Sequence, residues 1–285
     1  MPSMKTIKRR IASVDTTKKI MKAMDMVAAA KLQKVKAWLQ SARAFAQEAQ
    51  GMLTALEDCY QVRDSVFFKP REVRRAAYVV ITSDRGLCGS HNVNLTQKVL
   101  SQIGEDGNER MIVVGLKGHE FFAARGKHIL RTYPDVSETV LYPDAARVAE
   151  YARALYVAGE VDEVHLAYTE FETVLTHVPR IVKLLPASIR AGEPAEAGRP
   201  AGMAYEPDVQ SFLTHAIPLA LNAFVYAALV ESSACEQAAR MMSMESAVSN
   251  ASDIITKLTR TYNRRRQAVI TQEISEIVSS ANLMK

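Results

Sequence analysis

The chain has 285 residues, a net charge of +5 and 48% hydrophobic residues, which is the composition of a soluble protein long enough for one or two domains. No run of about 18 apolar residues occurs, which excludes a membrane-spanning helix by that criterion. The first residues lack the apolar core of a signal peptide, so we expect an intracellular protein.

Charge is distributed unevenly along the chain. Residues 1–57 carry 11 Lys and Arg against 4 Asp and Glu, residues 58–207 carry 18 against 20, and residues 208–285 carry 7 against 7. A basic helix can bind nucleic acid, bind an acidic protein partner, or present a solvated face to water. The sequence favours the last two interpretations over nucleic acid.

Residues 1–57 predict one long helix, from about Ser3 to Glu57. Its apolar and small residues recur at steps of three or four, which is coiled-coil spacing. They are Ile7, Ile11, Val14, Thr17, Met21, Met24, Ala28, Leu32, Val35, Leu39, Ala42, Ala46, Ala49, Leu53 and Leu56. The stripe is rich in methionine, which adapts to irregular partners. An ordinary helical hairpin would show the same periodicity.

Residues 58–207 predict an α/β domain, because short apolar strands alternate with helices. All 12 glycines lie between Gly51 and Gly202. The expected strands are 76–82, 111–115, 128–131, 163–169 and 180–185, and the expected helices are one after Ser90, 118–124 and 144–157. A loop or linker rich in glycine and proline is expected over 191–207.

Residues 208–285 predict a second long helix, with the clearest pattern from Pro218 to Lys285. Its stripe is Val230, Ala234, Ala238, Met241, Met244, Val248, Ala251, Ile255, Leu258 and Tyr262, and it resumes at Ile270, Ile274, Ile277, Ala281 and Met284. At a rise of 1.5 Å per residue the stretch would be roughly 100 Å long. A helix of that length needs a special reason.

The two long helices are expected to run antiparallel, because one leads into the central domain and the other leads out of it. The predicted fold is therefore of the α/β and α+β classes, with a long antiparallel coiled coil and a central Rossmann-like α/β domain. The last 20 or so residues should extend roughly 30 Å past the N-terminal helix. This tip, residues 264–285, has an apolar stripe and no partner in its own chain. Because a lone helix gains little stability, we expect another protein to sheathe it.

The loop 83–90 is the first candidate for chemistry. Its two glycines, Gly86 and Gly89, invite comparison with phosphate-binding loops, but the loop matches neither GxxxxGK[ST] nor GxGxxG. A simple turn is the favoured interpretation. Cys88 with His91 could form a thiol nucleophile, but no orienting carboxylate is evident.

Metal and disulfide chemistry find no support in the sequence. The cysteines, Cys59, Cys88 and Cys235, are isolated and odd in number, which argues against a disulfide framework. The six histidines lack metal-binding spacing. We expect no cofactor and no metal.

Two basic clusters lie on the long helices. Arg264, Arg265 and Arg266 span nearly the whole circumference of the helix, and Arg266 falls where the apolar stripe should continue. A solvated face and a belt that binds carboxylates of a surrounding partner are about equally supported. Lys18, Lys19 and Lys22 could contact phosphates, acidic loops or water, and nothing local decides between these.

Four motifs together carry a resemblance to a known family. Residues 7–31, the loop 83–89, residues 236–242 and residues 266–279 resemble, in order, the N-terminal helix, the central-domain motif and the C-terminal helix of the gamma subunit of F-type ATP synthases. The resemblance covers essentially the whole chain. One departure is Ser280, where the family often has glycine.

The resemblance implies a rotor shaft without bond chemistry of its own. It would turn inside a hexamer of three alpha and three beta subunits, on the cytoplasmic side of a bacterial plasma membrane, with no nucleic acid and no small-molecule substrate. Arg266 and Gln267 match the pair that contacts the beta-subunit catch loop, and Met24 matches the residue that faces the beta-subunit lever. Tyr205 and Glu206 match the segment that meets the membrane c-ring. An epsilon subunit would pack on the foot of the central domain.

Two rival functions stay open at the level of sequence. A basic helical protein could bind nucleic acid, which salt-dependent DNA binding by the free chain would support. An α/β domain with a glycine-containing loop could be an enzyme, which nucleotide binding by residues 70–190 would support.

Overall fold

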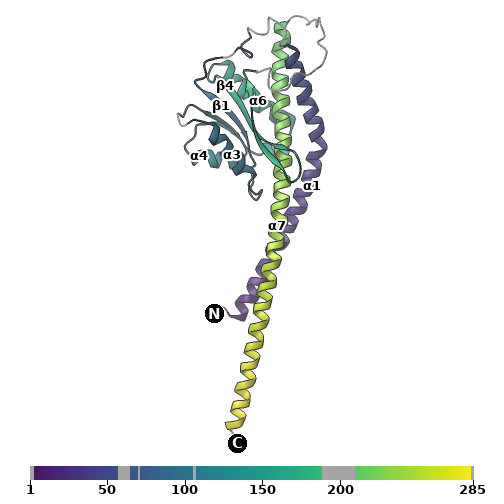
Figure 1. Ribbon diagram of the computed structural model, residues 1–285, viewed down its shortest axis with the longest axis vertical. Coiled ribbons are helices and arrows are strands. Elements are labelled where there is room, and N and C mark those ends of the chain that lie inside the picture. Colours follow the sequence, from purple (N-terminus) through teal and green to yellow (C-terminus); the bar gives the residue numbers. More distant parts are fainter. Residues whose placement is uncertain (1–2, 57–64, 70, 105–106, 188–208, 284–285) are drawn as a thin grey trace. The chain divides into compact units, whose positions relative to one another are not determined.

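The computed structural model describes residues 3–56, 65–69, 71–104, 107–187 and 209–283 (Figure 1). It divides into two compact units. The first unit combines Met1–Ala29 with Arg240–Lys285, and the second is Ala30–Ala239. The predicted domain boundaries, at residues 57 and 207, fall outside the described residues.

Two long helices run through the units. Helix α1 is Met4–Leu56 and helix α7 is Val209–Leu283. Ser3 caps α1, since its Oγ accepts a hydrogen bond from the backbone N–H of Thr6 at 3.2 Å. Pro218 lies inside α7. Proline removes one helical hydrogen bond, yet neighbouring apolar residues such as Ile217 and Leu221 are buried, and their packing favours the continuous helix.

The central sheet has five strands in the order β3-β2-β1-β4-β5. They are β1 (Ala76–Ile81), β2 (Arg110–Val114), β3 (Ile129–Tyr133), β4 (Glu163–Phe171) and β5 (His177–Leu185). The first four are parallel, and β5 pairs antiparallel with β4 at the edge. Strands such as β1 read as continuous apolar runs because both faces of a parallel sheet are buried.

Four shorter helices connect the strands. They are α3 (His91–Gln102), α4 (Leu116–Ala123), α5 (Val136–Thr139) and α6 (Tyr142–Val157). Helices α3 and α4 pack on one face of the sheet, in a core that holds Tyr78, Val80, Leu95, Val99, Met111, Val113, Phe122 and Ala167. This alternation of strand and helix confirms the predicted Rossmann-like α/β domain.

The predicted stripes of both long helices are buried where each unit packs. In the second unit, α1 buries Leu32, Val35, Leu39, Ala42, Ala49 and Leu53, and α7 buries Val230, Ala234 and Ala238. In the first unit Ile7, Ala28, Met244 and Ala251 are buried. Thr17 was predicted on the stripe but is exposed, because a helix of 3.6 residues per turn drifts away from a strict 3.5-residue repeat.

Among the residues that the structure describes, one helix is long and apolar enough to cross a membrane, by length and composition only. The stretch Phe212–Ser279 of α7 contains an 18-residue window that passes this test, and 61% of the window is buried inside the protein. The core helix of a soluble protein passes the same test, so the window is weak evidence for a membrane span.

Candidate functional site

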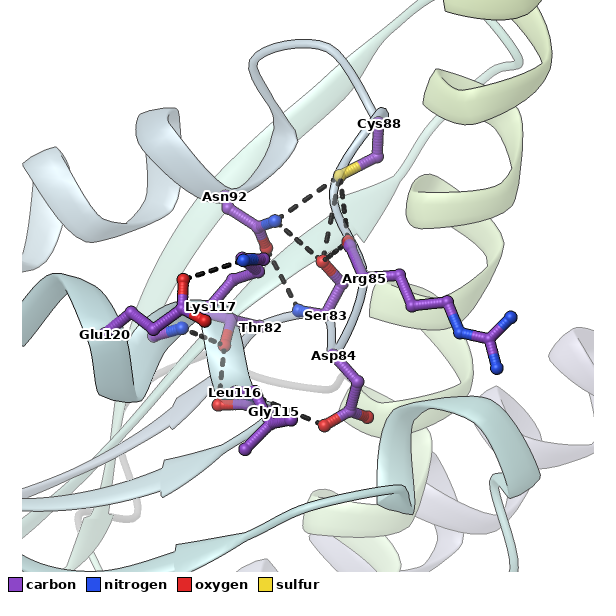
Figure 2. A network of polar contacts seen from close by, with 11 residues as sticks. Thr82, Ser83, Asp84, Arg85, Cys88, Asn92, Gly115, Leu116, Lys117 and Glu120 are labelled. Carbon is purple, nitrogen blue, oxygen red and sulfur yellow. Dashed lines mark hydrogen bonds and ion pairs between the residues drawn. The ribbon is translucent and has the colours of Figure 1, made fainter. Parts of the chain in front are cut away.

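The loop after β1 is held by a network of hydrogen bonds (Figure 2). Asn92, in the first turn of α3, is its centre. Its Oδ1 accepts from the backbone N–H of Ser83 at 3.0 Å, and its Nδ2 donates to Ser83 Oγ at 2.6 Å and to Cys88 Sγ at 3.3 Å. Ser83 Oγ in turn donates to the carbonyl of Arg85 at 2.7 Å. The Cys88 thiol is therefore part of a structural network, and it is buried.

The carboxylate of Asp84 binds the N-terminus of α4 in the same region (Figure 2). Its Oδ1 accepts from the backbone N–H of Leu116 at 3.1 Å. Its Oδ2 accepts from Ser137 Oγ at 2.7 Å. A helix N-terminus favours a negative charge and is a common place for phosphate. Here a side chain of the protein fills that place.

Two glycines let α4 approach β1 closely. A Cβ on Gly115 would lie 2.3 Å from the carbonyl oxygen of Thr82, and Gly115 also has a φ of +89°. A Cβ on Gly118 would lie 2.6 Å from Thr82 Oγ1, which accepts a hydrogen bond from the Gly118 N–H at 2.9 Å. The loop motif is thus a packing element between strand and helix.

Leu87 was missed by the sequence reasoning as a functional candidate. It has a φ of 62°, which is costly for a residue with a Cβ, and its side chain is 61% exposed. Strained backbone that the surrounding structure holds in place is typical of functional sites. The strain and the exposure make Leu87 a candidate functional residue, and no residue pattern in the sequence signals it.

Helix α7 fills the carboxyl edge of the sheet beside β4. Strands β1 and β4 pair as far as Val80 and Ala167. Beyond that point α7 takes the place of β1: the N–H of Thr169 donates to Ser232 Oγ at 3.1 Å, and the N–H of Phe171 donates to Glu231 Oε2 at 3.0 Å. In open α/β sheets this switch point, where strand order reverses, is where ligands usually bind.

Burial controls the ionisation of groups near this contact. Burial raises the pKa of Tyr168 to about 12, and the carboxylates of Glu231 and Glu170 act in the same direction. Burial also raises the pKa of Cys235, whose thiol donates to the carbonyl of Thr169 at 3.5 Å. Both side chains are therefore neutral at physiological pH.

The residues predicted to contact partners lie mostly on the long helices. Met24 is half-buried on α1, whereas Arg266 and Gln267 are exposed on α7. Within the arginine cluster Arg264 is exposed and Arg265 is half-buried. Among the lysines, Lys19 pairs with Asp15 at 2.9 Å on the surface. The remaining two predicted residues, Tyr205 and Glu206, lie outside the described residues.

The end of α7 exposes its apolar stripe, as the difference in helix length predicts. The exposed fractions are 46% for Ile270, 56% for Ile274, 69% for Ile277 and 53% for Val278. Isolated exposed apolar residues are normal, but a row of isoleucines at helical spacing is not. Such a row is typical of a protein–protein or membrane interaction surface.

Comparisons with known proteins identify the family. A family model described as ATP synthase matches residues 3–284. The ATP synthase gamma chain of Heliobacterium modesticaldum is 42% identical over 286 residues, and that of Alkaliphilus metalliredigens is 41% identical over 285 residues, each with 99% of both chains covered. The chain belongs to the ATP synthase gamma-chain family.

Solved structures agree with this assignment. The central stalk and c-ring structure of the Tetrahymena thermophila mitochondrial ATP synthase contains a chain that is 26% identical, with a TM-score of 0.64, covering 80% of this chain and 99% of that one. The Euglena gracilis rotor structure shares the fold, with 22% identity and a TM-score of 0.70, covering 94% and 98%. The resemblance to the gamma subunit is thus confirmed, as is the function that it implies, a rotor subunit of the central stalk. The nucleic-acid alternative is not favoured.

Proposed function

We propose that this gamma chain is a non-catalytic shaft that turns inside a hexamer of three alpha and three beta subunits. The observation that carries the proposal is the exposed isoleucine row of α7, at Ile270, Ile274 and Ile277. The surrounding alpha and beta subunits would cover this row. Catalysis would then belong to the surrounding subunits.

Three residues of the long helices are the proposed contacts with the beta subunits. Arg266 and Gln267 are exposed, and the planar donor fork of an arginine suits carboxylates on a surrounding loop. Met24 would face the acidic lever of a beta subunit with the exposed part of its side chain. Val27, three positions further and on the same face of α1, is 57% exposed and extends that apolar surface.

The remaining proposed partners would contact the central domain and the segment that follows it. Tyr205 and Glu206 would meet the polar loops of the membrane c-ring, and an epsilon subunit would pack on the foot of the central domain. The chain would then be a peripheral protein on the cytoplasmic side of a bacterial plasma membrane.

Rotation can shift affinities only if the shaft binds the states of the hexamer unequally. A ligand with equal affinity for two states shifts neither. The two helices differ in length and in charge, because residues 1–57 are strongly basic and residues 208–285 are neutral. That asymmetry would present a different surface to each beta subunit at every angle.

The test combines composition with coupling. A tagged chain purified from its source membranes should bring down three copies each of two larger nucleotide-binding subunits, together with ATPase activity. In that complex, Arg266→Ala should reduce ATP-driven proton pumping more than Lys285→Ala, which removes the same charge at the chain end. Equal pumping by both variants, or recovery of the chain without ATPase subunits, would contradict the proposal.

A further inference from the structure

One arginine connects three separate elements of the second unit. From α1, Arg43 Nε donates to Glu231 Oε1 on α7 at 2.9 Å, and its Nη2 donates to the carbonyl of Phe171 at the end of β4 at 2.5 Å. Glu231 Oε2 accepts from the N–H of the same Phe171 at 3.0 Å. Arg43, Glu231 and Phe171 thus close a ring of three hydrogen bonds, here called the joint.

The joint lies at the contact between strand β4 of the sheet and the two long helices. Beyond Ala167, the edge of β4 has α7 as its neighbour instead of β1, and Ser232 binds the N–H of Thr169 next to the joint. The side chain of Glu231 is only 9% exposed, whereas that of Arg43 is 40% exposed. The carboxylate is therefore desolvated and depends on these donors.

The hydrogen bonds of the joint resist rotation of α1 and α7 against β4, whereas the apolar contacts around the joint resist it little. The helix faces around it are rich in small residues such as Ala42, Ala234 and Ala238, and apolar contact is not directional. Hydrogen bonds to charged groups are directional, and the fork of arginine fixes two acceptors in one plane. Beside the neutral hydrogen bonds of Ser232 and Cys235 with Thr169, the joint adds an ion pair that fixes both α1 and α7 against β4.

We propose that the joint transmits torque between the sheet domain and the helix pair. The inference rests on the proposed shaft function and adds to it the residues that would prevent slip. When the membrane ring drives the foot of the sheet domain, the two helices must turn with it. Arg43 and Glu231 are positioning residues in this step, and neither touches a substrate.

The test is done in the intact complex. It compares ATP hydrolysis in the absence of a proton gradient with proton pumping, in which the rotor works against one. Glu231→Gln and Arg43→Lys are the variants. Arg43→Lys keeps the charge beside Glu231 but loses the second arm of the fork, which reaches Phe171. In membranes made permeable to protons, which removes the load, we expect ATPase activity of the intact complex to stay within about twofold of wild type. In sealed membranes we expect the ratio of protons pumped to ATP hydrolysed to fall about fivefold, the scale of a lost interaction between two residues in contact.

A charge swap sharpens the test. In Arg43→Glu/Glu231→Arg an ion pair could form again, but the glutamate would then face the Phe171 carbonyl and the arginine its N–H. The swap should therefore fail to restore pumping. The matched control is Glu150→Gln on α6, which breaks a surface ion pair with Arg153 and should leave the ratio unchanged.

The two proposals fail in different ways. If the variants assemble and pump as wild type does, the joint has no part in torque transfer and the shaft function stands. If the swap restores pumping, the ion pair alone transmits torque and the bonds to Phe171 have no part in it. If ATPase and pumping fall by the same factor, the joint is only structural and the inference is overturned. If the wild-type chain does not assemble with ATPase subunits, the shaft function itself fails.

Discussion

Asp84 Oδ1 accepts a hydrogen bond from the backbone N–H of Leu116 at 3.1 Å, where the first residue of α4 meets the loop after β1. The second carboxylate oxygen accepts from Ser137 at 2.7 Å. One buried side chain therefore connects three segments of the sheet domain. A loop whose two glycines only invite comparison with phosphate-binding loops is therefore a structural clamp in this chain.

Removing the Asp84 carboxylate should destabilise the protein. Asp84→Ala leaves the Leu116 N–H and the Ser137 hydroxyl without their acceptor, and an unsatisfied buried polar group costs about 1–3 kcal/mol. Asp84→Asn keeps an acceptor oxygen and should cost less. Urea unfolding of both variants checks the order, and equal midpoints for Asp84→Ala and wild type would contradict the clamp.

Gly115 and Gly86 form a matched pair for testing the close approach of α4 to β1. Gly115→Ala places a Cβ 2.3 Å from backbone at a φ of +89°, whereas a Cβ on Gly86 meets nothing within 4 Å. We expect Gly115→Ala to lower the free energy of unfolding by more than about 3 kcal/mol and Gly86→Ala by less than about 1 kcal/mol. Thermal melts of the two variants measure the difference. Similar melting temperatures would show that the contact relaxes easily.

His165 should make the sheet domain sensitive to mild acid. Burial lowers the pKa of His165 below the usual range of histidine, against the opposing effect of its hydrogen bond to Glu163, and nearby Lys183 also lowers it. A depressed folded-state pKa gives stability that is present above the unfolded pKa and is lost as pH falls through the folded pKa. The melting temperature should therefore drop as pH falls from about 7 to 5.

The variant His165→Phe isolates this contribution. It keeps a ring stacked on Tyr78, whose centroid lies 4.9 Å from that of His165, but it cannot be protonated. Its melting temperature should fall less over the same pH range. Part of the slope should persist, because burial also lowers the pKa of His177. An unchanged slope in His165→Phe would assign the acid sensitivity to other groups.

The exposed row on α7 should matter only in the complex. Ile274 is 56% exposed, so Ile274→Ala should change the stability of the free chain by less than about 0.5 kcal/mol. Leu39→Ala, at a buried position of α1, should cost about 2–5 kcal/mol. Amide exchange over residues 270–278 should be fast in the free chain and slow in the assembled complex. Equal exchange in both states would mean that nothing covers the tip.

The sequence predicted the elements well and their connections poorly. All five strands were found within a few residues, because buried β-branched runs such as 76–81 have a clear signature. The four-residue helix Val136–Thr139 was missed, since it is too short to show a period. The antiparallel direction of β5 was not predicted either, because the short turn that sets it carries no distinctive dipeptide.

The joint shows why contacts at long range escape sequence reasoning. Nothing in the sequence distinguishes Glu231, a charge that follows an apolar segment, or Arg43, one of the 11 basic residues of positions 1–57. Their pairing depends on β4 extending past β1, which no local pattern reveals. The exposed tip, in contrast, followed from counting helix lengths alone.

Because α1 pairs with α7, the first helix is synthesised long before its partner. Arg43 and its partner Glu231 are 188 positions apart, and ribosomes add about 5–20 residues per second. The apolar face of the newly made first helix therefore stays uncovered for roughly 10–40 seconds, until the residues that cover it have been synthesised. During that interval it is a surface on which nascent chains can aggregate, and chaperones that hold amphipathic helices would be needed at this stage of the chain's life.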